Sequence, residues 1–338
     1  LFFSIKDLFN IKITVPIIGF LSLEPTIMQY HSSFWSESVF FSIQLICLAF
    51  ILKKRKKNYD YLFMGITLGL LGLQKQYAIF LIIPIIIFNM IYFKNKLNLS
   101  YIVTGFFLVL SIIGFNNYER SGKFYILTAD TTIAIHIDLV SKVMSKKLNI
   151  TNKEFRILEG EYAKKWIVKN KKYASELKMK NPDFLDYRSS LKEKDKVFFD
   201  NYFRNRSLEY IMKYPFDFGK FILKSSVHTF LLNPFHIYSD NNFRSGELYY
   251  KSPTHQKLLI PRTIYTAILY LIILGGFFQF FKEDKEKFYL ITLLFFYFYG
   301  LVAWHGNTRY FVPCLIYLSF YFSFGLKFYK KLICHVKR

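Results

Sequence analysis

The chain has 338 residues, of which 53% are hydrophobic and 20% aromatic, and it carries 46 Lys and Arg against 23 Asp and Glu. This composition excludes a disordered basic protein, because such chains are poor in apolar residues. With 15 Gly and 9 Pro, the chain is also not collagen-like or Pro/Gly-rich. The formal net charge of +23 suggests a nucleic-acid-binding protein. Whether the chain is one depends on where the basic residues lie.

Long apolar stretches recur along the chain and divide it into three regions. Eight of them approach the ~20 residues that a helix needs to cross a bilayer. They lie at 8–23, 34–52, 59–73, 77–93, 98–114, 263–281, 288–304 and 311–328. We therefore predict an all-α polytopic membrane protein. Its membrane regions are 1–114, with five spans, and 263–338, with three, and a large, mostly helical segment covers 115–262.

The basic residues fall at alternate ends of the predicted spans. Lys and Arg gather in the links at 53–57, 94–96 and 282–287 and in the tail at 327–338, whereas the opposite short links carry only Lys75 and Arg309. The third and fourth spans are divided at Gln74-Lys75-Gln76 because this alternation requires it. By the positive-inside rule, the basic links face the cytoplasm. This places both termini in the cytoplasm of a bacterium, the spans in its inner membrane, and 115–262 on the periplasmic side.

The excess of positive charge does not indicate a nucleic-acid partner. Apolar runs separate the basic residues, so they cannot form one continuous face that follows a phosphate backbone. The 115–262 segment holds 27 Lys and Arg against 16 Asp and Glu, but long loops are translocated largely regardless of charge. We expect membrane lipids as partners and no nucleic acid.

The outer segment contains several helix signals. Thr151-x-x-Glu154 is a capping-box pattern, and it precedes apolar residues at helical spacing, namely Phe155, Leu158, Tyr162 and Trp166. Asn181-Pro182 is a second helix start. The stretch after Pro215 predicts a helix that either lies in the outer membrane interface or is buried within the segment.

Neither disulfides nor a metal are indicated by the sequence. The three cysteines, Cys47, Cys314 and Cys334, all lie outside the 115–262 segment, so no disulfide framework holds that segment together. No Cys/His metal spacing or Gly-rich phosphate loop is present. We therefore expect no cofactor, and a divalent metal has no support in the residues.

Ionisable residues close to the outer ends of the spans are candidates for function, because burying a charge in a bilayer is costly. They are Glu24, Glu37, Lys75 and Arg309. Lys75 and Arg309 can hold a phosphate, Lys as a point charge and Arg through two parallel hydrogen bonds. Alternatively, both side chains reach toward lipid headgroups as interfacial anchors.

Other residues near the outer ends of the predicted spans can be interpreted either functionally or structurally. Glu37 can orient a sugar or a catalytic group, or it can be an acidic residue favoured in the first turn of a helix. His31 and His305 can hydrogen-bond sugars or serve structurally. Tyr30, Tyr77 and Tyr310 can stack on sugar rings or belong to an aromatic belt at the membrane surface.

Several motifs carry a family resemblance in their order along the chain. SLEPTIMQYHSSFWSES has a Pro ending one span and a Ser-Glu pair opening the next, and GLLGLQKQYAIFLIIP has Lys75 where Arg is commoner. NNYERSGKFYILTADTT is similar to a strand-like outer segment that begins with Asn and continues through Gly, and Asn117 and Gly122 match these two residues. NRSLEYIMKYP leads back to the membrane, and NTRYFVP opens a C-terminal span. Together these motifs resemble the bacterial GT-C glycosyltransferases, the relatives of protein mannosyltransferases and aminoarabinose transferases.

The resemblance implies a GT-C-like helical bundle that moves a sugar from a polyprenyl-phosphate donor to a glycan or protein acceptor. Within this function we predict Lys75 and Arg309 at the phosphate, Glu37 in a supporting role, and His31, Tyr77 and Tyr310 as sugar or acceptor contacts. The family's catalytic carboxylate lies in the first outer loop, and residue 1 here corresponds to about the end of the second span. We therefore expect the general base upstream of residue 1 and interpret the chain as N-terminally truncated.

Two other functions remain open. A flippase or transporter for lipid-linked glycans needs polar residues along its spans, and this chain has few, such as Gln44 and Glu37. An enzyme similar to the O-antigen polymerases is the second alternative, because such enzymes also have a large outer loop. No feature of the sequence favours a purely structural membrane scaffold.

Overall fold

The computed structural model describes residues 1–32, 36–53, 56–92, 96–122, 124, 126, 135–169, 193–230, 253–302 and 311–336. Within these ranges the chain is almost entirely helical and contains no strand, which confirms the predicted all-α class. The contacts divide the chain into two compact units. Unit 1 comprises Leu1–Val109 and Ser225–Arg338, and unit 2 comprises Leu110–Lys224.

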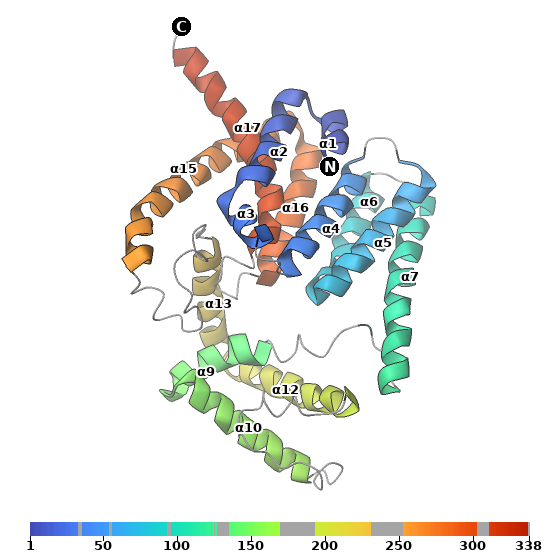
Figure 1. Cartoon of the computed structure of the whole chain (residues 1–338), viewed down its shortest axis with the longest axis vertical. Coiled ribbons are helices and arrows are strands. Elements are labelled where there is room, and N and C mark those ends of the chain that lie inside the picture. The colour runs from blue at the N-terminus through green and yellow to red at the C-terminus, as the bar shows by residue number, and fades with distance from the viewer. Residues whose placement is uncertain are drawn as a thin grey trace. The chain divides into compact units, whose positions relative to one another are not determined.

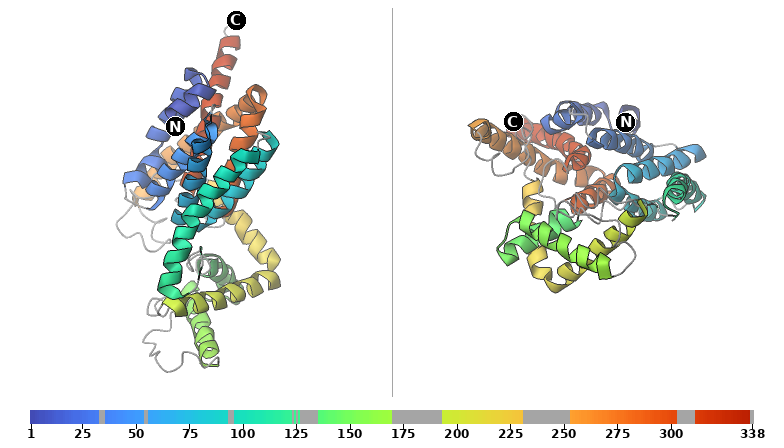
Figure 2. Two further views of the ribbon diagram at one scale, coloured as in Figure 1. Left: turned by 90° about the vertical axis from the view of Figure 1, so that its right-hand side faces the viewer. Right: turned by 60° about the horizontal axis from the view of Figure 1, so that its bottom comes forward.

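Unit 1 is a bundle of helices that run in both directions between its two ends (Figures 1 and 2). Its helices are α1 (Phe2–Leu8), α2 (Ile11–Leu23), α3 (Pro25–Ser32), α4 (Ser36–Leu52), α5 (Asn58–Gln74), the short 3-10 helix η1 (Gln76–Leu81), α6 (Ile82–Tyr92), the part of α7 (Lys96–Ser121) up to Val109, α15 (Pro253–Glu283), α16 (Lys285–Val302) and α17 (Val312–Val336). Helix α17 packs against α2, α4, α15 and α16. In its most apolar stretch 72% of the residues are buried, against 33% in α7 and in α15, so α17 forms the core of the unit.

Each predicted span overlaps at least one helix, but the boundaries differ: the first span begins before α2, and the fourth covers both η1 and α6. Among the described residues, three stretches are long and apolar enough to cross a membrane, Asn98–Glu119, Thr263–Glu283 and Val312–His335. Apolar helices at Ile11–Leu23, Ser38–Leu52 and Gln76–Ile91 are shorter. At 1.5 Å per residue, a helix of about 15 residues falls short of a hydrocarbon core of about 30 Å. Three candidate spans support a membrane protein, and the total of eight stays a prediction.

The connections between helices lie at two opposite ends of unit 1 (Figure 1). One end holds the end of α4, the start of α5 and the end of α15; there Lys53 pairs with Asp60 at 2.7 Å and Lys327 pairs with Glu283 at 2.6 Å. The other end holds the start of α4, the end of α5, the end of α16 and the start of α17. Lys75 follows α5 and therefore lies at this second end.

Glycines allow two pairs of helices in unit 1 to cross at close range. A Cβ atom on Gly276 of α15 would clash with the backbone carbonyl of Tyr321 on α17. A Cβ atom on Gly65 of α5 would clash in the same way with the carbonyl of Ile102 on α7. Small residues at helix crossings are typical of membrane bundles, because they let the two backbones touch.

Helix α7 extends beyond the predicted fifth span. It continues to Ser121 and ends where Gly122 adopts a positive φ of 69°, a common way to terminate a helix. Phe124 then packs edge-to-face on Phe115, with ring centroids 5.7 Å apart. The expectation of a strand-like segment is therefore wrong for residues 117–121, which are helical, and most of its remainder lies outside the described residues.

The described part of unit 2 consists of the end of α7 followed by helices with many charged residues. They are η2 (Ile135–Val140), α9 (Ser141–Leu148), α10 (Asn152–Lys169), α12 (Glu193–Lys213) and most of α13 (Pro215–Phe230). The helix predicted after Pro215 is confirmed as α13, and Phe216 on it is 91% exposed. Its location in a membrane interface stays a prediction. The predicted helix start at Asn181-Pro182 lies outside the described part of the chain.

Helix α10 begins with the predicted capping box but buries a different face. The Thr151 N–H donates to the Glu154 carboxylate at 2.7 Å, and the Glu154 N–H donates to the Thr151 hydroxyl at 3.1 Å. The buried line runs through Phe155, Glu159 and Ala163, whereas Tyr162 is 42% exposed. The helix is therefore confirmed. Its buried side includes the carboxylate of Glu159, which the hydrophobic pattern of the sequence predicts to be exposed.

Candidate functional site

Lys75 lies at an interruption between two helices, at the end of unit 1 opposite Lys53 and Lys327. Helix α5 ends at Gln74, and Lys75 has extended backbone angles of φ −142° and ψ 110°. Its N–H donates to the Leu71 carbonyl at 2.9 Å, and its carbonyl accepts from the Ala78 N–H at 2.8 Å. The predicted break at Gln74-Lys75-Gln76 is confirmed as a helix boundary, while the division into two membrane spans stays a prediction. The Lys75 side chain is half-buried.

Tyr77 connects η1 to two neighbouring helices of unit 1. Its carbonyl accepts a hydrogen bond from the Tyr297 hydroxyl of α16 at 2.5 Å. Its ring packs edge-to-face on Phe40 of α4, with centroids 5.9 Å apart, and Phe40 packs on Phe298 at 6.0 Å. Tyr77 is thus half-buried in an aromatic cluster close to Lys75 in the chain, and its role as a sugar contact stays a prediction.

Glu24 has a structural role in the same unit. Its side chain is 3% exposed, and one carboxylate oxygen accepts the Ile27 N–H at 2.8 Å in the first turn of α3. The other oxygen accepts the hydroxyls of Thr26 at 3.0 Å and Tyr265 at 2.9 Å. Glu24 therefore caps α3 and fastens it to α15, which accounts for its burial without a catalytic role.

The other predicted site residues are only partly covered. His305, Arg309 and Tyr310 lie outside the described residues. His31 belongs to α3 and Glu37 to α4, but their side chains also lie outside the described part. The structure therefore places Lys75 and Tyr77 at one end of unit 1, and the roles of the other residues stay predictions.

Comparisons with known proteins give no further assignment. No family model, curated protein or solved structure matches this chain.

Among the described residues, no group of three or more His, Cys, Asp and Glu could hold a metal ion. All three cysteines are free, with Cys47 and Cys314 buried and Cys334 exposed.

A polar network that the sequence did not predict lies in the core of unit 2. The Nε2 atom of His136 lies 3.6 Å from the Glu159 carboxylate, and both side chains are fully buried. Tyr210 donates to Glu159 at 2.6 Å, and the Arg206 Nε donates to Glu159 at 3.4 Å. On the other side of the imidazole ring, Nδ1 lies 2.9 Å from the Ser207 hydroxyl. The network joins η2, α10 and α12.

Burial controls the electrostatics of this network. Burial, aided by the charge of Arg206, lowers the pKa of His136 to about 3, so the imidazole is neutral at physiological pH. Burial also raises the pKa of Glu159. The hydrogen bonds from Tyr210 and Arg206 and the charge of Arg206 act in the opposite direction and lower it. Arg206 therefore supplies the positive charge that compensates the buried carboxylate.

The network has residue types found in nucleophilic triads, but it does not have the access that catalysis requires. Serine, histidine and a carboxylate in hydrogen-bonding order can activate a hydroxyl. Here Ser207 is 3% exposed, and His136 and Glu159 are 0% exposed, so a substrate cannot reach the hydroxyl. We interpret the network as a structural link. Its signal in the sequence was the position of Glu159, four residues from both Phe155 and Ala163 on one face of α10.

Proposed function

We propose that this protein is a membrane glycosyltransferase. It moves a sugar from a polyprenyl-phosphate donor to an acceptor hydroxyl on a lipid-linked glycan, a cell-envelope polysaccharide or a protein. The observation that carries the proposal is the position of Lys75, a half-buried cation at a helix break, at the end of unit 1 opposite the basic links. The order of the GT-C-like motifs supports the same function.

The proposed membrane arrangement follows from the distribution of charge. Eight helices cross the bacterial inner membrane, both termini lie in the cytoplasm, and the end of unit 1 that holds Lys75 faces the periplasm. The three long apolar helices and the positions of Lys53, Lys282 and Lys327 at one end of unit 1 support this arrangement. Lipid-linked sugars present their phosphate at the membrane surface, which is the level of Lys75 in this arrangement.

The chemistry requires charge at the phosphate and a base at the acceptor. The acceptor oxygen attacks the anomeric carbon, the bond from that carbon to the phosphate oxygen breaks, and the phosphate leaves with the electron pair. A general base takes the acceptor proton, which typically contributes about 10²–10⁴-fold. Lys75 and Arg309 stabilise the leaving phosphate, with Glu37 in support, and such electrostatic stabilisation is usually the larger contribution.

Substitution of Lys75 tests the proposal. The full-length gene product is reconstituted in lipid vesicles with polyprenyl-phosphate sugars, and transfer to an acceptor is measured for Lys75→Gln, Lys75→Arg and Arg309→Gln. Because a hydrogen bond to a charged group contributes about 1.5–3 kcal/mol, we expect kcat/KM for the donor to fall about 10- to 100-fold in Lys75→Gln. Lys75→Arg keeps the charge and should retain most of the activity.

The matched control is Lys282→Gln, which removes an exposed lysine near the end of α15, at the basic end of unit 1. It should leave transfer unchanged. Unchanged turnover and donor affinity in both Lys75→Gln and Arg309→Gln would overturn the phosphate assignment. If the wild-type protein moves a lipid-linked sugar across the vesicle membrane without transferring it, the chain is a flippase and the proposal fails.

A further inference from the structure

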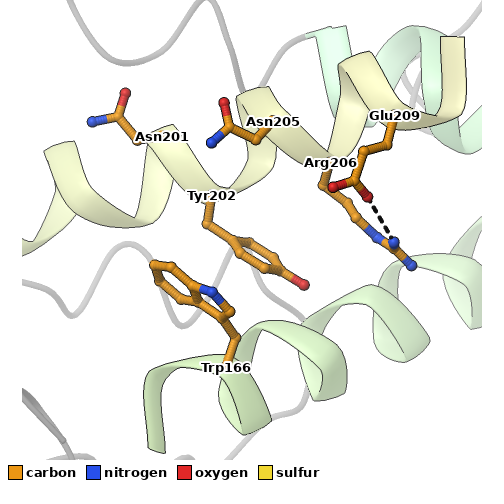
Figure 3. A pocket seen from close by; sticks show the side chains of 6 residues that line it. All are labelled: Trp166, Asn201, Tyr202, Asn205, Arg206 and Glu209. Atoms are coloured by element: carbon orange, nitrogen blue, oxygen red, sulfur yellow. Dashed lines mark hydrogen bonds and ion pairs between the residues drawn. The ribbon is translucent and has the colours of Figure 1, made fainter. Parts of the chain in front are cut away.

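A surface pocket of about 450 Å³ lies in unit 2 between α10 and α12 (Figure 3). Its size is in the range of small-molecule sites, about 300–1,000 Å³. Its lining comprises Trp166 of α10 and, from α12, Asn201, Tyr202, Asn205, Arg206 and Glu209. The α12 residues recur at intervals of one helical turn, so a single stripe of that helix forms one side of the pocket.

Two aromatic rings form the apolar part of the pocket. Trp166 and Tyr202 extend toward each other from the two helices (Figure 3), with ring centroids 4.9 Å apart and planes tilted by 38°. Both side chains are half-buried, so each ring also presents surface to solvent. The face of an aromatic ring is negative and attracts polarised C–H groups. A pyranose ring has a face that carries such C–H groups, and it packs on an indole or phenol in this way.

Two amides supply the polar part. Asn201 and Asn205 are exposed and lie one turn apart on α12. An amide side chain offers both a donor and an acceptor, which suits a sugar hydroxyl that is itself both. Within the described residues, the structure gives neither amide a hydrogen bond, so both are available to a ligand.

The charges of the pocket favour a neutral ligand. Arg206 pairs with Glu209 at 3.0 Å and with the buried Glu159 at 3.4 Å, so two carboxylates balance its charge. A phosphate or a nucleotide would have to compete with them. Nucleic-acid bases also stack on aromatic rings, but their binding sites combine stacking with uncompensated cations along the backbone. The lining of this pocket contains no uncompensated cation.

We propose that the pocket between α10 and α12 binds a neutral oligosaccharide, with a sugar ring packed on Trp166 and Tyr202 and its hydroxyls bonded to Asn201 and Asn205. This site lies apart from Lys75 in the chain and goes beyond the proposed transfer function. A transferase, a polymerase and a flippase can each use a glycan-binding site outside their membrane spans. The proposal therefore stands whether or not Lys75 binds a phosphate.

Ligand-observed saturation-transfer NMR on the full-length protein in detergent micelles tests the site without any donor. The probes are three neutral tetrasaccharides, built from β-linked glucose, α-linked mannose and β-linked N-acetylglucosamine. We expect saturation of the C–H protons of at least one of them. Trp166→Ala should weaken its binding about tenfold, because the variant loses both the aromatic face and the apolar area that the indole buries against the sugar. Trp166→Phe should restore most of it.

The matched control is Phe216→Ala, which removes an aromatic side chain that is 91% exposed on α13 and does not line the pocket. It should bind the saccharide as the wild type does. Failure of all three probes to bind, equal binding by Trp166→Ala, or equal weakening by Phe216→Ala each overturns the proposal. Displacement of the saccharide by a short single-stranded RNA at lower concentration would also overturn it, because it would show a nucleic-acid site.

Discussion

Glu159 shows how a buried carboxylate can be accommodated within a helical unit. An ionised carboxylate moved out of water costs several kcal/mol unless it is paired and hydrogen-bonded. Glu159 is 0% exposed and has the Tyr210 hydroxyl at 2.6 Å and Arg206 at 3.4 Å. The neutral imidazole of His136 fills the remaining side at 3.6 Å. The positions of α10 and α12 are therefore coupled through polar contacts as well as through apolar packing.

This network predicts a pH dependence of the stability of unit 2. The pKa of His136 is lowered to about 3 in the folded chain, from 6.5 in the unfolded chain. Between these values the unfolded chain binds a proton that the folded chain does not, so stability falls as the pH drops below 6.5. The slope is about 1.4 kcal/mol per pH unit, or about 2 kcal/mol from pH 6.5 to pH 5.

The opposite shift of Glu159 makes a variant comparison necessary. Its pKa is raised, so the folded chain takes up that proton first and gains stability as the pH falls. Hydrogen-exchange protection of the α10 and α12 peptides is measured in the full-length protein at pH 6.5 and pH 5, for the wild type and for His136→Asn. The His136→Asn variant should lose about 2 kcal/mol less protection over this interval. An equal loss in both proteins would show that His136 does not determine the dependence.

Local signals in the sequence predict the elements of this protein well. The capping box at Thr151 and the helix break at Lys75 depend on neighbours within a few residues, so both follow from the sequence. The buried face of α10 does not, because Arg206 and Tyr210, about 50 residues further along, make burial of Glu159 favourable. The capping role of Glu24 likewise depends partly on Tyr265, more than 200 residues away.

The candidate site is less predictable than the elements for the same reason. Lys75 stands out in the sequence because it is the only basic residue of its link. The pocket around Trp166 and Tyr202 gives no such signal, because its two sides come from separate helices. Trp166 at helical spacing predicts an apolar helix face, and only the packing of α12 beside α10 turns it into part of a polar pocket.

The crossing of α15 and α17 provides a test at the level of helix packing. A Cβ atom on Gly276 would overlap the Tyr321 carbonyl, and backbone atoms cannot move aside as a flexible side chain can. Overpacking of this kind typically costs about 1–3 kcal/mol. We therefore expect Gly276→Ala to lower the thermal denaturation midpoint of the detergent-solubilised protein by several degrees.

Gly300→Ala is the control for this substitution. Gly300 lies in α16, and among the described residues a Cβ atom added to it would have no neighbouring atom within 4 Å, so alanine meets no clash from them. Since alanine is favoured over glycine in helices by about 1 kcal/mol, this variant should be as stable as the wild type or slightly more stable. A Gly276→Ala variant as stable as Gly300→Ala would contradict the close crossing of α15 and α17.

For the whole molecule, the two ends of unit 1 should face opposite sides of the membrane. The described lysines Lys53, Lys282 and Lys327 lie at one end, and the link that contains Lys75 lies at the other. Because Lys and Arg are retained preferentially on the cytoplasmic side, the charge distribution sets the orientation. The native cysteines make this testable, since Cys47 and Cys314 are buried and Cys334 is exposed near the end of α17.

Cysteine labelling with a membrane-impermeant maleimide on bacterial spheroplasts measures this orientation directly. In the wild-type protein Cys334 should react only after the membrane is permeabilised, because it follows the basic end of α17. In a Lys75→Cys, Cys334→Ser variant, position 75 should react in intact spheroplasts, because it lies at the opposite end of unit 1. Labelling of Cys334 in intact spheroplasts would reverse the orientation and place Lys75 in the cytoplasm. Phosphate binding from the periplasmic side would then be excluded, whatever the effect of Lys75→Gln on activity.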